Sequence, residues 1–159
     1  MAELVLPDGT KVMLDREMNR ALEEGVRNSG DTLNYTEVVS GGLQDSCEIY
    51  HTLRVPRGGE YTLVLADGTT VYLNAESELR FPKQFRGKKR KVYLTGEGYF
   101  DVQRNEKQPF IVEAQQVAIR VLGTSFGVRA YTREVNVLTT LVQGRVNVEA
   151  DGQQVELNP

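Results

Sequence analysis

The chain has 159 residues, a net charge of −3 and an apolar fraction of 40%. This charge gives no general attraction to nucleic acid or to an anionic membrane, and no apolar run approaches the roughly 18 residues of a membrane span. The single cysteine, Cys47, excludes an intrachain disulfide, and with His51 as the only histidine the chain cannot build a Cys/His zinc site.

One eleven-residue sequence motif occurs twice in the chain. Residues 4–14 read LVLPDGTKVML and residues 63–73 read LVLADGTTVYL, with eight of eleven positions identical. Asp-Gly between alternating apolar residues is a strong hairpin signal, because glycine adopts positive φ without steric cost. The repeat predicts two related β-hairpins that share one conformation and one sheet system.

The segment after the first hairpin is ambiguous. Met18, Ala21, Leu22 and Val26 have helical spacing, which allows one short helix near residues 15–27. The chain then alternates like a strand around residues 33–35. A further strand is expected within residues 46–54, before the rigid turn at residues 56–59.

The most regular alternation is at residues 91–102, where the even positions are apolar or glycine. Period two makes these positions the core face of a strand, and Gly96 and Gly98 predict a bulge or a close backbone approach. The apolar phase flips across Gly123, which predicts a bend there. From residue 59 onward, turns recur about every ten residues, which leaves no room for a crossover helix.

These patterns predict an all-β fold built of stacked short hairpins, solenoid-like or sandwich-like, with at most the one short helix. The residues expected in the core are Leu65, Val71, Leu73, Leu79, Val92, Leu94, Phe100, Val102, Phe110, Val112, Val121, Phe126 and Val128.

Two patterns resemble catalytic motifs, and each favours a structural interpretation. Residues 123–127 match G-x-S-x-G around Ser125, but a strand rather than a helix should follow, and His51 lies upstream. Glu97 and Asp101 share one strand face about 13 Å apart, too far for a glycosidase pair. We expect Glu97 to accept hydrogen bonds from backbone N–H groups or hydroxyls. No catalytic, cofactor or metal residue is assigned, although a hydrolase remains a third hypothesis.

A basic cluster covers residues 83–91, with Phe81 and Phe85 interleaved. Basic and aromatic residues together can bind single-stranded nucleic acid. A solvated turn is the favoured interpretation, protein docking the next, and nucleic acid the last. The candidate partner contacts are Lys83, Arg86, Lys88, Lys89 and Lys91.

An ordered series of motifs runs from residue 56 to the end: PRGG at 56–59, LxDGTxVxLNA at 65–75, SxL at 77–79, FP at 81–82, RxVxLxGE at 90–97, YFxV at 99–102, PFIV at 109–112, VLGTSF at 121–126, Val128, AY at 130–131 and GxV at 144–146. In these motifs the chain resembles the FecR-type periplasmic domain of membrane-bound anti-sigma regulators, in particular the Bacteroidetes branch. Gly98 and Gly127 depart from this family, which often has Ala and Asn there.

The resemblance divides the chain into an N-terminal β segment, residues 1–55, and a FecR-like β domain, residues 56–159, within one continuous structural unit. It implies a signal-relay domain in the periplasm, without a cofactor or small-molecule substrate. The implied partners are a TonB-dependent outer-membrane transducer and, through a cytoplasmic region and a membrane helix outside this sequence, an extracytoplasmic-function (ECF) sigma factor. We therefore expect a fragment of a longer protein.

The alternative function is a β-sandwich carbohydrate-binding module. Such a module would need exposed aromatic side chains on one flat face, which Tyr61, Tyr72, Tyr93 and Tyr99 could supply.

Overall fold

The computed structural model describes residues 2–14, 20–23, 26–36, 49–85, 87–131, 138–143, 146–150 and 153–157, and in these residues every regular element is a strand. The all-β prediction is therefore confirmed. The strands are β1 (Ala2–Val5), β2 (Lys11–Leu14), β3 (Arg20–Glu23), β4 (Val26–Ser29), β5 (Thr32–Asn34), β6 (Tyr50–Val55), β7 (Tyr61–Val64), β8 (Thr70–Leu73), β9 (Ser77–Pro82), β10 (Arg90–Asp101), β11 (Phe110–Ala114), β12 (Val117–Val121), β13 (Ser125–Ala130), β14 (Leu138–Gln143), β15 (Val146–Ala150) and β16 (Gln153–Leu157).

The segment that allowed a short helix contains two paired strands, β3 and β4. Tertiary packing overrides the helical spacing here, because Val26 is fully buried and β4 pairs with β5 on its other side. Residues 15–19 and 24–25 of that segment lie outside the described residues.

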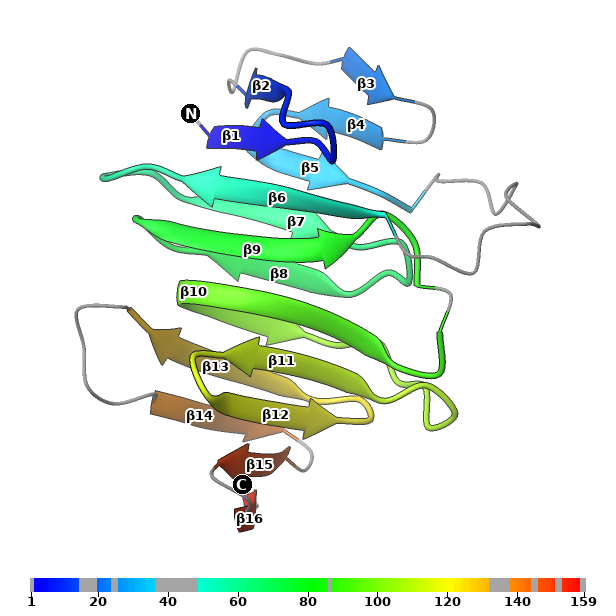
Figure 1. Cartoon of the computed structure of the whole chain (residues 1–159), viewed down its shortest axis with the longest axis vertical. Coiled ribbons are helices and arrows are strands. Elements are labelled where there is room, and N and C mark those ends of the chain that lie inside the picture. The colour runs from blue at the N-terminus through cyan, green and yellow to red at the C-terminus, as the bar shows by residue number, and fades with distance from the viewer. Residues whose placement is uncertain are drawn as a thin grey trace.

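The strands form two layers. Sheet A has the order β2-β1-β6-β9-β10-β11-β12-β15-β16, and sheet B the order β3-β4-β5-β7-β8-β10-β13-β14. Neighbours are antiparallel except β5–β7 and β10–β11, which are parallel. Figure 1 shows the strands lying across the long axis, with the chain progressing from the N-terminal strands at one end to the C-terminal strands at the other. The architecture is thus both solenoid-like and sandwich-like.

Strand β10 belongs to both sheets. Its first half pairs with β9 and β11 in sheet A, and its second half, from Gly96, pairs with β8 and β13 in sheet B. The burial alternates without interruption along all twelve residues. Gly96 stands at the joint with φ +100°, and a Cβ there would lie 2.7 Å from the Cα of Ser77. The expected close approach at Gly96 is confirmed.

The two copies of the repeated motif form two hairpins with the same turn conformation. In each, the glycine has φ near +90° (Gly9 +88°, Gly68 +90°), and its N–H donates to a carbonyl three residues earlier at 2.9 Å. The carboxylates of Asp8 and Asp67 each accept the N–H two residues later at 2.9 Å. The first hairpin, β1–β2, lies in sheet A and the second, β7–β8, lies in sheet B.

All the residues expected in the core are buried, with exposed fractions of 6% or less. Phe100 and Phe126 stack at 5.3 Å between ring centroids and form the centre of this cluster with Phe110. The bend at Gly123 is also confirmed: it separates β12 in sheet A from β13 in sheet B. A Cβ on Gly123 would lie 2.6 Å from the Cα of Arg104. The phase flip in the sequence therefore marks a change of sheet.

Replacing Phe100 by Ala should lower the free energy of unfolding by about 3–5 kcal/mol, because a fully buried ring leaves a cavity between the sheets. Urea denaturation would measure this loss, with the exposed Lys89→Ala as the control. A midpoint equal to that of the control would show that Phe100 does not pack in the core.

A matched pair of glycine variants tests the joint in β10. Gly96→Ala should cost well over about 1 kcal/mol, because the positive φ and the Ser77 backbone both oppose a Cβ. Gly127→Ala should be nearly neutral, because the nearest atom to its Cβ is Tyr99 Cδ2 at 3.8 Å. Thermal melting of both variants gives the comparison, and equal melting temperatures would contradict the assigned role of Gly96.

Candidate partner-binding surface

The five candidate contact residues do not form one uniform patch. Lys88 and Lys89 are exposed in the connection between β9 and β10, and Lys83 is half-buried with its backbone N–H bonded to Ile49. Arg86 lies outside the described residues. Lys91 is on β10, where the carboxylate of Glu113 lies 3.2 Å from Nζ and raises the pKa of the lysine. The charges most open to a partner are therefore Lys88 and Lys89.

Arg90, grouped with this basic cluster in the sequence, is 1% exposed. Its Nη1 donates to Asp67 Oδ2 at 2.8 Å and to the Gln103 carbonyl at 2.7 Å, and its Nε donates to the Gln108 carbonyl at 2.7 Å. Nη2 reaches the Leu122 carbonyl at 3.3 Å. One guanidinium thus joins the second Asp-Gly turn to two loops at the same end of the sandwich, and Arg90 belongs to the interior.

Replacing Arg90 by Met should destabilise the protein by about 3–5 kcal/mol, because it breaks a buried ion pair and leaves several carbonyls without a donor. Lys89→Met, one position earlier and exposed, is the matched control and should change stability little. Chemical denaturation of the two variants tests this. If Arg90→Met and Lys89→Met had the same free energy of unfolding, the Arg90 side chain would not be buried as described.

The side chains of the motifs that resembled catalytic sites contact other residues of the fold. Glu97 accepts a hydrogen bond from the Asn74 amide and lies 3.8 Å from Arg129, so its side-chain partners differ from the backbone N–H groups and hydroxyls expected. Asp101 accepts from the Ser125 hydroxyl at 3.1 Å. The single histidine is buried on another strand, β6, where its Nδ1 lies 2.7 Å from a tyrosine hydroxyl, that of Tyr35.

The four tyrosines considered for a carbohydrate platform do not share one face. Tyr61 is 2% exposed and donates to Asn28. Tyr93 lies on sheet A, where its ring is 6.1 Å from that of Tyr50. Tyr72 and Tyr99 are neighbours on sheet B, with ring centroids 6.1 Å apart.

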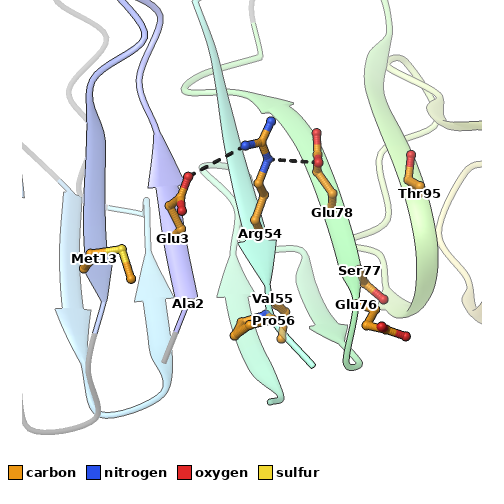
Figure 2. A pocket seen from close by; sticks show the side chains of 10 residues that line it. All are labelled: Ala2, Glu3, Met13, Arg54, Val55, Pro56, Glu76, Ser77, Glu78 and Thr95. Atoms are coloured by element: carbon orange, nitrogen blue, oxygen red, sulfur yellow. Dashed lines mark hydrogen bonds and ion pairs between the residues drawn. The ribbon is translucent and has the colours of Figure 1, made fainter. Parts of the chain in front are cut away.

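A hollow of about 410 Å³ crosses sheet A near the ends of its strands. Register aligns Met13, Glu3, Arg54, Glu78 and Thr95 in one row across five strands. Figure 2 shows the guanidinium of Arg54 between the carboxylates of Glu3 and Glu78. Arg54 Nη1 lies 3.7 Å from Glu3 Oε1, and Arg54 Nε lies 3.0 Å from Glu78 Oε2. The charges of this row are therefore paired across strands. Within the described residues, Glu3 Oε1 is buried and accepts no hydrogen bond, so its nearest positive partner in the row is the Arg54 guanidinium.

Within the described ranges, no group of three or more His, Cys, Asp or Glu residues could hold a metal ion. No helix in those ranges has the length and apolar character to cross a membrane.

The fold and the described surface define an all-β domain whose open features are surface hollows and an exposed basic loop. The chain belongs to the FecR protein family, whose model matches residues 51–147. This confirms the resemblance drawn from the motifs. The FecR-type anti-sigma factors are a regulatory rather than a catalytic family.

Two crystal structures, each of a protein proposed to be an anti-sigma factor from Parabacteroides distasonis ATCC 8503, are similar to this chain. One matches with a TM-score of 0.68 at 35% identity over 69% of this chain and 52% of its own. The other matches with a TM-score of 0.67 at 36% identity over 68% of this chain and 51% of its own. The chain thus spans about half the length of these relatives. None of the curated proteins matches it.

Proposed function

We propose that this chain is the periplasmic signal-relay domain of a single-span anti-sigma factor. It receives a signal from a TonB-dependent outer-membrane transducer and passes it to an ECF sigma factor through a cytoplasmic region outside this sequence. The family match over residues 51–147 carries the proposal, and the two similar structures support it.

The packing of the domain suits a relay. Two sheets share β10 and one buried cluster, so the part around β10 moves as a unit. Close-packed interiors transmit a displacement because they have little free volume to absorb it. A contact made near β10 can therefore be passed to the strands that pack around it.

Lys88 and Lys89 are our proposed first contacts with the transducer. They are exposed, next to each other, and carried by a chain of net negative charge. Charges at an interface rim steer association and orient the partners. Lys91 is a less accessible contact than these two, because Glu113 lies 3.2 Å from its Nζ.

The test is charge reversal in the full-length regulator, in cells that also carry its transducer. Lys88→Glu with Lys89→Glu should lower transducer-dependent sigma activity, because the steering charge is inverted. The control is Lys11→Glu with Arg120→Glu, which makes the same change of net charge at exposed positions away from the loop.

A sigma-responsive reporter measures the result, and circular dichroism of the isolated domain checks that it folds. Normal induction by the variant with Lys88→Glu and Lys89→Glu would show that this loop is not part of the contact surface. If deleting the transducer gene changed nothing in the wild type, the relay function itself would be wrong.

A further inference from the structure

The outer face of sheet B carries a second hollow, of about 280 Å³, over β8, β10, β13 and β14. Register places Tyr72, Tyr99, Gly127 and Thr140 in one row across these four strands. Because the row contains a glycine between an aromatic ring and a threonine, the sheet surface is lowest at Gly127. Leu138, on the neighbouring row, forms part of the wall.

Two large apolar side chains are exposed at this hollow. Leu138 is 60% exposed and Tyr72 is 48% exposed, and both line it. Exposed apolar residues scattered singly need no explanation. These two lie on opposite sides of one depression, on β8 and β14, and apolar walls around a depression are typical of an interaction site. Tyrosine is also among the residue types that dominate binding energy when they border a pocket.

The charged groups of the hollow are engaged with each other. Glu97 accepts a hydrogen bond from Asn74 and lies 3.8 Å from Arg129, so one acid and one base cancel at this rim. A charged peptide would need an excess of one sign. An uncharged apolar side chain fits both the walls and the neutral rim.

We infer that this hollow is a docking site for a partner protein, which inserts an aromatic or branched aliphatic side chain over Gly127 from an uncharged segment. The site is on the opposite sheet from the row shown in Figure 2, whose carboxylates and arginine are already paired. The inference does not depend on the proposed relay function, because it concerns only what this surface binds.

The hollow can be filled without disturbing the fold. A Cβ at Gly127 would meet only Tyr99 Cδ2, at an ordinary 3.8 Å, so Gly127→Leu should occupy the space meant for the partner. Leu138→Lys is a second variant, which removes a wall at an exposed position. The matched control is Thr95→Leu, which adds the same side chain on the outer face of sheet A.

The probe is a phage library of short random peptides, panned on the folded domain and followed by calorimetric titration of the enriched sequences. We expect uncharged peptides with an aromatic or aliphatic anchor. Their affinity should fall about tenfold or more in Gly127→Leu and Leu138→Lys and stay unchanged in Thr95→Leu.

Three results would overturn the inference. One is that no peptide is enriched, and another is that the enriched peptides bind Gly127→Leu as well as they bind the wild type. The third is that a parallel glycan array binds the domain and loses binding in Gly127→Leu, which would make the hollow a carbohydrate site. Melting curves of all variants show that each change acts on a folded protein.

Discussion

Both sheets depend on one strand that is a member of each. Strand β10 has four neighbours, because each half is hydrogen-bonded on both edges. Its inward face is continuous from Arg90 to Phe100, so a slip of one residue would turn the core side chains of both layers toward solvent. Gly96 allows the strand to pass from one sheet to the other without such a slip. The positions of the hairpins on either side follow from this single register.

The strands and turns could be predicted individually because each depends on the pattern of residues within its own segment. Period two identified the core face around Val92 and Phe100, and the phase flip located the bend at Gly123. Strand order could not be predicted in this way, since pairing partners such as β5 and β7 are set by distant packing. The strands near Val26 were missed for the same reason. The spacing of the apolar residues in this segment suits a helix. The segment forms strands because β4 pairs with β3 on one side and with β5 on the other.

Features of the surface are harder to predict from the sequence, and Arg90 shows why. It was grouped with the lysines by charge, although it is in phase with Val92 and Leu94 on the inward face. The alternation contained the signal, but burying an arginine also requires acceptors, and these come from residues 67, 103, 108 and 122. The hollow at Gly127 likewise could not be predicted from the sequence, because the residues that line it come from four strands. Such groupings exist only after the chain has folded.

The orientation of the strands also determines how the domain responds to mechanical force. The strands lie across the long axis, so their hydrogen bonds run along it (Figure 1). Tension between the two ends of the stack therefore loads these bonds in series and peels terminal strands away one pair at a time. Such peeling should stop at β10, which must part from neighbours in both layers at once. A pull of this kind would loosen the ends of the domain before its centre.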